Sequence, residues 1–246
     1  MTSTSKTKVF FEFLKLDRPR TPGQMESLLA DVKRGFDASA ELRRESRRYN
    51  GGLNKKYFEE IYPLTLLARH LFAGRNDVLC EPNLDDTKSF DAVITIGSGP
   101  GSDATKLLVE FTYAKDGYDE ALRMEKLNDQ GHVSLTASLT RTGTKKTGRH
   151  ITIGEDILER RDDRLKECLR LILDRIARKA GPRYSGVHAL AVVFDDILGF
   201  RKPEEIALLR TSIESSVRRS TLNFRTLILL GSSGNVFLEF PLSESR

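Results

Sequence analysis

Apolar residues recur three and four positions apart in the first part of the chain, which predicts helices there. One stripe belongs to a helix that begins near Thr21 or Pro22 and carries Met25, Leu28, Leu29 and Val32. A second helix is predicted from residue 37 to about residue 48. Ahead of both, the run at residues 8–14 is predicted as a short strand or a docking segment.

The next predicted helix, residues 54–72, places a carboxylate among apolar side chains. Its stripe consists of Leu53, Tyr57, Glu60, Leu64, Leu67 and Leu71. A carboxylate in such a stripe is costly unless it has a partner or a function. Glu60 is therefore a candidate site residue, and the alternative is that it lies at the edge of the stripe and reaches water. Pro63 predicts a late start or a kink in this helix.

Short apolar and β-branched runs then predict strands. Three of them occur in series, at residues 77–80, 90–96 and 106–113, and suggest an antiparallel meander. A helix near 118–128, a hairpin within 133–153 and a long helix over 156–179 follow. The last predicted elements are a nearly all-apolar strand at 187–194, a helix at 203–219 and strands at 224–230 and 236–240.

This order predicts an α/β fold, a mixed central sheet flanked by helices. Residues 1–50 are predicted as an N-terminal helical extension, and residues 51–246 as the α/β domain. The 246 residues are enough to bury a sizeable core.

Composition excludes several classes of protein. Hydrophobic residues make up 39% and charged residues 30%, as in ordinary globular domains. No apolar run is long enough for a membrane helix and the first residues resemble no secretory signal, so we expect a cytoplasmic protein that does not bind membranes. Cys80 and Cys168 lie in apolar runs and are expected to be free thiols.

The net charge of +5 conceals a segregation of charge along the chain. Residues 61–130 carry 7 basic and 12 acidic side chains, whereas residues 131–150 carry 4 basic side chains and no acidic one. Residues 1–60 are also net basic, with 13 basic and 9 acidic side chains. An acidic middle between basic segments indicates a protein that holds a cation in one place and an anionic partner in others.

Two acidic residues of that middle segment are candidate metal ligands. If strands 90–96 and 106–113 pair, Asp91 and Glu110 become neighbours at one edge of the sheet. Converging carboxylates repel each other, and a divalent cation with a preference for hard oxygen ligands, Mg²⁺ or Mn²⁺, removes that repulsion. Such an ion can activate water and stabilise charge on a phosphate. The alternative is that Asp91 begins a strand at the surface and Glu110 pairs with a nearby Lys or Arg.

The order of a helix with Glu60, a strand with Asp91 and a strand with Glu110 resembles the PD-(D/E)xK, or restriction-endonuclease-like, superfamily. The resembling segments are Phe58-Glu59-Glu60, then residues 90–94, then Val109-Glu110-Phe111-Thr112-Tyr113. The resemblance implies a metal-dependent nuclease. In it, Asp91 and Glu110 would bind the metal, Glu60 would assist, and a lysine two residues after the glutamate would orient or deprotonate water.

The sequence departs from the family at that lysine, where it has Thr112. Alternation places Thr112 on the same face as Glu110, but a hydroxyl carries no positive charge. Either a basic residue from elsewhere replaces the lysine, with Arg123 and Lys126 as the nearest candidates, or catalysis is lost and the fold only binds nucleic acid or a protein partner. A third reading is an interaction protein that binds no nucleic acid.

The hairpin tip at residues 141–149 is the best candidate for contact with nucleic acid, DNA more than RNA. Its cations are Arg141, Lys145, Lys146 and Arg149. They lie among small residues that let backbone amides approach phosphates. The alternative is a solvated tip. The N-terminal helices, with arginines at 43, 44, 47 and 48, are candidates for a homodimer contact or for docking a protein partner.

Overall fold

The computed structural model describes residues 6–47, 52–85, 87–97, 103–134, 137–144, 148–156, 160–197, 199–218 and 222–242. The N-terminal half contains the helices α1 (Lys6–Leu14), α2 (Pro22–Ala38), α3 (Ala40–Arg47), α4 (Gly52–Lys56), the π-helical turn η1 (Tyr57–Ile61) and α5 (Tyr62–Phe72). The later helices are α6 (Gly117–Gln130), α7 (Arg161–Arg178), the 3₁₀ turn η2 (Pro182–Tyr184) and α8 (Pro203–Val217).

Six strands form one mixed sheet in the order β1-β2-β3-β6-β7-β8. Their bounds are β1 (Val78–Pro82), β2 (Ala92–Ile96), β3 (Thr105–Ala114), β6 (Ala189–Phe194), β7 (Thr226–Gly231) and β8 (Phe237–Pro241). Strands β1 to β3 form the predicted antiparallel meander. Strand β6 pairs in parallel with β3 and with β7, and β8 returns antiparallel. The predicted α/β class with a mixed sheet is confirmed.

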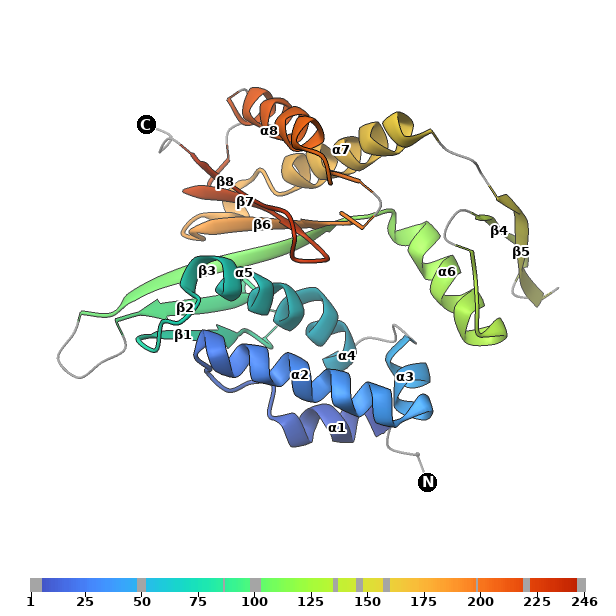
Figure 1. Ribbon diagram of the computed structural model, residues 1–246, viewed down its shortest axis with the longest axis horizontal. Coiled ribbons are helices and arrows are strands. Elements are labelled where there is room, and N and C mark those ends of the chain that lie inside the picture. The colour runs from blue at the N-terminus through green and yellow to red at the C-terminus, as the bar shows by residue number, and fades with distance from the viewer. Residues whose placement is uncertain are drawn as a thin grey trace.

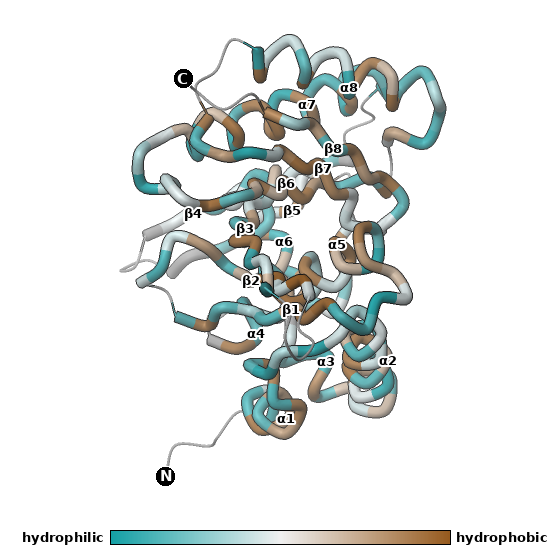
Figure 2. The backbone as a smooth tube through the Cα atoms, turned by 90° about the vertical axis from the view of Figure 1, so that its left-hand side faces the viewer, coloured by the Kyte–Doolittle hydropathy of each residue, from teal (hydrophilic) through white to brown (hydrophobic). Residues whose placement is uncertain are grey.

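Helices cover both faces of this sheet (Figure 1). Alternation along the strands sorts the core into two clusters: Ala191 and Val193 of β6 pack with α1, α2 and α5, whereas Leu190 and Val192 pack with α7 and α8. Strongly hydrophobic segments accordingly gather on the strands in the middle of the molecule (Figure 2). The sheet is therefore the rigid centre from which the ends of β2 and β3 present their side chains.

The N-terminal helices share the first of these two cores. Phe11, Met25 and Val32 belong to the same buried cluster as residues of β2, β6 and β7. Helix α2 begins as predicted, with Thr21 as its N-cap and Gln24 completing a capping box.

The prediction of a strand at residues 8–14 is wrong, because residues 6–14 form α1. Its buried residues, Thr7 and Phe11, are four apart, and Phe11 stacks on Tyr57 with ring centroids 5.1 Å apart. Glu45 accepts hydrogen bonds from both the backbone N–H and the hydroxyl of Thr7. Tertiary packing therefore decides the conformation of a segment whose local pattern was ambiguous.

Between β3 and α7 the chain makes an excursion to one end of the molecule (Figure 1). It forms α6 and then the predicted hairpin, β4 (Ala137–Thr144) and β5 (Gly148–Asp156), a separate two-stranded sheet. None of the helices in the described part of the chain has the length and apolar character that a bilayer-crossing segment requires.

Candidate active site

A cleft of about 610 Å³ opens beside the end of β3, between η1 and α7. We call it the carboxylate cleft. The predicted site residues Glu60, Asp91, Glu110 and Thr112 all line it. The other lining residues are Lys55, Lys56, Glu59, Asp85, Lys88, Phe111, Tyr113, Lys115, Gly117, Arg175, Lys179 and Arg183.

The register of β2 against β3 brings Asp91 and Glu110 together. Ala92 pairs with Val109, so Asp91, one residue before β2, faces Glu110. The Asp91 backbone N–H donates to the Val109 carbonyl at 2.9 Å, and the Asp91 Oδ2 atom accepts the Phe111 N–H at 2.8 Å.

Both acids are held in a poorly solvated place. Burial raises the pKa of Asp91, against the lowering effects of the Phe111 N–H and of Lys179 and Lys56. Burial and then the charge of Asp91 raise the pKa of Glu110 to about 7. Burial therefore disfavours the charged form of both acids, and the charge of Asp91 further disfavours the charged form of Glu110, which is a situation that a divalent cation relieves.

Glu60 enters the cleft because the helix is deformed around it. Pro63 has no N–H to donate to the Glu59 carbonyl, so the regular α-helical ladder cannot pass through this point. The chain widens instead into the π-turn η1, in which the Tyr62 N–H donates to the Tyr57 carbonyl. Glu60 is 9% exposed. Its carboxylate lies 2.9 Å from the Lys56 ammonium, so it is neither on the surface nor without a counter-charge.

A hydrogen bond fixes this turn to the strand that carries Glu110. The Tyr113 hydroxyl, on β3, donates to the Phe58 carbonyl at 2.5 Å. Because Phe58 and Tyr113 connect η1 directly to β3, the positions of Glu60 and Glu110 are coupled through two rigid elements.

The cation beside Glu110 is Lys179, which directly follows α7. Its ammonium forms an ion pair with the Glu110 carboxylate and lies 5.0 Å from the centre of the Tyr184 ring. Burial lowers the pKa of Lys179, but hydrogen bonds to Glu110 and Tyr184 outweigh this effect and raise it above its ordinary value. Lys179 is therefore a stable positive charge at the carboxylate pair.

The two basic residues expected to replace the missing lysine lie elsewhere. Arg123 binds Asp119 at 2.7 Å and donates to the carbonyls of Ser134 and Ala137. Neither Arg123 nor Lys126 is among the residues that line the carboxylate cleft. Thr112 does line it, next to Glu110, as alternation along β3 predicted.

Positive side chains surround the acids. The cleft has seven cations (Lys55, Lys56, Lys88, Lys115, Arg175, Lys179 and Arg183) against five carboxylates (Glu59, Glu60, Asp85, Asp91 and Glu110). Aromatic rings contact four of these cations: Lys88 lies over Phe90, Lys115 over Tyr113, and both Lys179 and Arg183 over Tyr184. Sequence reasoning missed this ring of cations, although the cluster Arg175, Arg178, Lys179 and Arg183, at the end of a predicted helix and just beyond it, was a visible signal.

Of the four residues predicted to bind nucleic acid, only Arg141 has a described side chain, and it does not line this cleft. Lys145 and Lys146 lie outside the described residues, and of Arg149 only the backbone, in β5, is described. Arg141 forms an ion pair with Glu125 of α6, and its side chain is 27% exposed. Its charge is therefore already compensated within the protein.

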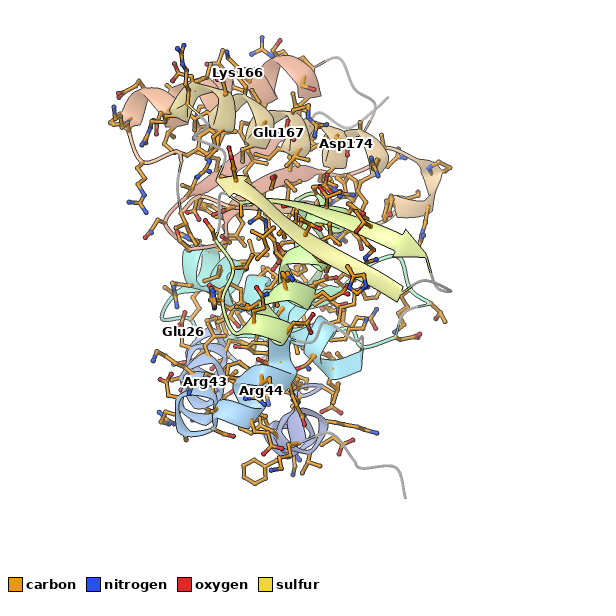
Figure 3. The ribbon with its side chains drawn as sticks, turned by 90° about the vertical axis from the view of Figure 1, so that its right-hand side faces the viewer. Glu26, Arg43, Arg44, Lys166, Glu167 and Asp174 are labelled. Atoms are coloured by element: carbon orange, nitrogen blue, oxygen red, sulfur yellow. The ribbon has the colours of Figure 1, made fainter. Side chains whose placement is uncertain are left out.

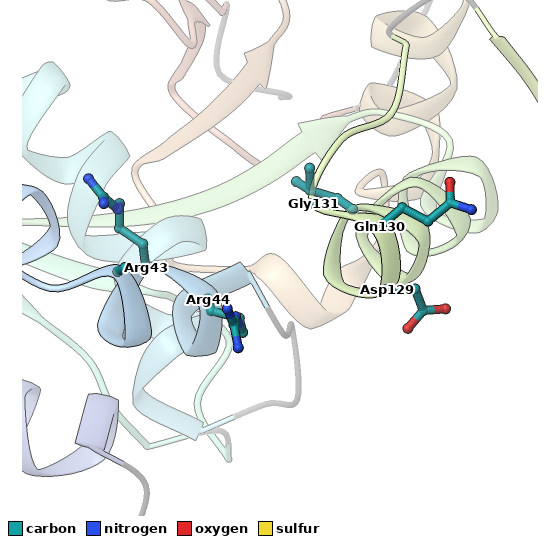
Figure 4. A pocket seen from close by; sticks show the side chains of 7 residues that line it. Arg43, Arg44, Asp129, Gln130 and Gly131 are labelled. Carbon is teal, nitrogen blue, oxygen red and sulfur yellow. The ribbon is translucent and has the colours of Figure 1, made fainter.

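Arg43 and Arg44 of α3 line a different hollow, whereas Arg48 lies outside the described residues and only the backbone of Arg47 is described. The hollow measures about 630 Å³ and lies between α3 and the end of α6. Figure 4 shows Arg43 and Arg44 on α3 opposite Asp129, Gln130 and Gly131. This hollow shares no residue with the carboxylate cleft.

The donor set of the carboxylate cleft fits a magnesium-type ion. Mg²⁺ commonly uses one or two protein carboxylates and completes its coordination with water and substrate phosphates. Asp91 and Glu110 supply such a pair. Within the described ranges, no group of three or more His, Cys, Asp and Glu side chains is arranged to hold a metal by itself.

Comparison with known proteins adds no relative from which a role could be transferred. No protein-family model matches the chain, and no similar curated protein or solved structure matches it.

Proposed function

We propose that this protein is a metal-dependent nuclease of the PD-(D/E)xK type, acting on nucleic-acid phosphodiesters, with DNA as the favoured substrate. The observation that carries the proposal is the group formed by Asp91, Glu110 and Lys179 in one cleft. The residues come from three separate elements, and the cation is present although the motif position holds Thr112.

The arrangement of elements supports the same proposal. A helix, a three-stranded antiparallel meander, a crossover helix and a strand parallel to the third are the parts that the resemblance implies. Here they are α5, β1 to β3, α7 and β6, and the candidate acids lie on β3 and just before β2. Strand β7, strand β8 and helix α8 extend this core on its far side.

Each side chain has a role that follows from its surroundings. Asp91 and Glu110 would hold Mg²⁺ or Mn²⁺, which supplies an activated water and charge compensation at the phosphate. Lys179 keeps a positive charge against Glu110 and is placed to orient a water or to stabilise negative charge on the phosphate. Lys56 holds Glu60 in the cleft, and the surrounding cations attract the phosphate backbone.

A second candidate function is a nuclease fold that binds nucleic acid without cutting it. The residue that favours it is Thr112, because the hydroxyl cannot perform the charge-dependent part of the motif. In this case the cations of the carboxylate cleft still bind the phosphate backbone, and binding still weakens steeply with salt.

The test is cleavage of plasmid and of single-stranded DNA in Mg²⁺ and in EDTA, comparing the wild type with Asp91→Ala and Glu110→Ala. We expect nicking that needs Mg²⁺ and falls on the order of a thousandfold in each variant, because several kcal/mol of charge stabilisation are lost. Asp77→Ala, outside the cleft, is the matched control. Nicking that survives in both cleft variants would exclude the site, and salt-sensitive binding without nicking would establish the second function.

A further inference from the structure

A second pocket adjoins the carboxylate cleft and shares Lys115 with it. It measures about 580 Å³, within the range of roughly 300–1,000 Å³ typical of small-molecule sites. It lies between α6, β4 and α7, and we call it the α6–α7 pocket. Figure 3 shows Glu167, one of its residues, on α7 above the hairpin.

Part of the wall of this pocket is apolar. The apolar part includes Ala114, Ala137, Leu139, Leu165, Leu171 and Phe200. A flat aromatic ring with apolar faces can pack between such side chains, whereas a phosphate cannot.

The charge of the α6–α7 pocket also opposes a phosphate. Five carboxylates (Asp116, Asp119, Glu120, Glu167 and Asp195) outnumber three cations (Lys115, Arg123 and Arg164). Most of these carboxylates have structural partners: Asp119 binds Arg123, Glu167 binds Arg170, and Asp116 caps α6. Among the described residues, the half-buried Glu120 takes part in none of the ion pairs or side-chain hydrogen bonds found, so its carboxylate can accept from a ligand.

One wall of the pocket is held in a strained conformation. Phe200 has a backbone φ of 54°, a left-handed value that a bulky side chain adopts only where the surrounding structure imposes it. It is 3% exposed and meets Phe194 edge to face, with ring centroids 5.5 Å apart. The surrounding structure holds Phe200 in this conformation at a cost on the order of 1–3 kcal/mol and so keeps an aromatic side chain in the pocket wall.

We infer that the α6–α7 pocket receives one unpaired nucleobase of the strand whose phosphate lies in the carboxylate cleft, with Glu120 accepting a hydrogen bond from an exocyclic amino group. The inference rests on the proposed function. A base is one sugar away from its phosphate, and Lys115 lines both spaces, so one nucleotide can occupy them together. Carboxylates accept from the amino group of cytosine, which thymine lacks.

The test is binding of short single strands of about 12 nucleotides, made of deoxycytidine, of thymidine or of abasic sugar-phosphate. Anisotropy is measured in EDTA, so that no strand is cut. The abasic strand reports on phosphate contacts alone. We expect the deoxycytidine strand to bind about tenfold more tightly than the thymidine strand, and the thymidine strand more tightly than the abasic one.

Two variants and a control locate the effect. Glu120→Ala should lower the affinity for deoxycytidine to that for thymidine and leave thymidine unchanged. Leu139→Trp, which fills the pocket from β4, should bring both strands to the abasic level. Asp129→Ala, an exposed acid at the other end of α6, should change none of the three affinities.

The outcomes separate this inference from the proposed function. Equal, salt-sensitive binding of all three strands would overturn the base pocket and leave phosphate binding in place. A deoxycytidine preference that persists in Glu120→Ala would overturn the role of that carboxylate. Free deoxycytidine that displaces the strand at a similar concentration would overturn the coupling to the cleft, and failure of every strand to bind at low salt would overturn both proposals.

Discussion

The two cavities that meet at Lys115 have opposite chemistry. The carboxylate cleft holds seven cations and five carboxylates, and its acids Glu60 and Glu110 are buried beneath the cations. The α6–α7 pocket holds three cations and five carboxylates within apolar walls. Adjacent spaces with opposite charge balance suit two parts of one nucleotide better than two separate anions, because a phosphate needs cations and a base needs apolar surface.

The cavities differ in reactivity as well. The carboxylate cleft combines two neighbouring acids, one of which raises the pKa of the other, with a lysine that stays charged. The α6–α7 pocket contains Cys168, but burial raises the pKa of its thiol to about 12, so no thiolate nucleophile is available there near neutral pH. If the proposed function is correct, the first cavity would carry the catalytic chemistry and the second the recognition of the base.

The variant Lys179→Met should have the largest effect of the three described next. Loss of the cation leaves Glu110 buried beside Asp91, so we expect cleavage to fall about a hundredfold and the free energy of unfolding to fall by about 3 kcal/mol at pH 8. Both are measured on purified protein, by nicking and by urea unfolding. Base preference, a property of the other cavity, should not change.

Arg178→Met is the matched control for this substitution. Arg178 precedes Lys179 on the same helix, and its exposed side chain pairs with Asp174 at 2.9 Å. It should alter stability by less than about 1 kcal/mol. Lys179→Arg should restore most of the stability, and equal losses in Arg178→Met and Lys179→Met would contradict a specific role for Lys179.

Next in size is the dependence of stability on pH. The pKa of Glu110 is raised from 4.5 to about 7 in the folded protein, so its protonated form favours folding. The stability that this group contributes is fully present below pH 4.5 and is lost as the pH rises through about 7, on the order of 2 kcal/mol in the absence of metal.

Urea unfolding in EDTA across this range measures the loss. Glu110→Gln should flatten the curve, and Mg²⁺ should restore stability to the wild type at pH 8 because the cation replaces the proton between the acids. The same slope in Glu110→Gln and in the wild type would assign the pH dependence to other groups.

The smallest effect should come from Arg183→Ala, which removes one cation from the rim of the carboxylate cleft. Binding of deoxycytidine, thymidine and abasic strands should weaken together by about threefold, and the slope of affinity against salt should fall by about one. Arg34→Ala, on α2, is the control. A loss of affinity for only one of the two bases would contradict the assignment of phosphate binding to one cavity and base binding to the other.

The acidic half of the candidate site was accessible from the sequence. Strand periodicity placed Asp91 and Glu110 on paired strands, and helical periodicity placed Glu60 among apolar residues, because both patterns are local. The π-turn could be anticipated only as a disturbance at Pro63. The direction in which this turn points the Glu60 side chain depends on the hydrogen bond between Tyr113 and Phe58, which the sequence does not show.

The basic half was not accessible in the same way. Lys179 follows Glu110 by 69 positions, and no local spacing connects them. Only the parallel pairing of β3 with β6, and the docking of α7 across them, brings the two side chains together. Arg123 looked closer along the chain, but its guanidinium is engaged with carbonyls of the segment that leads into β4.

The excursion between Glu110 and Lys179 has a consequence for how such a protein can change. Both ends of this segment are anchored to the sheet, through β3 and through α7, and the hairpin β4–β5 is not part of that sheet. Doubling the length of a flexible connection costs only about 0.6 kcal/mol in closure entropy. Helix α6 and the hairpin can therefore be exchanged, shortened or extended while the sheet is unchanged. In the proposed nuclease, such changes would alter substrate preference and leave the cleavage chemistry the same.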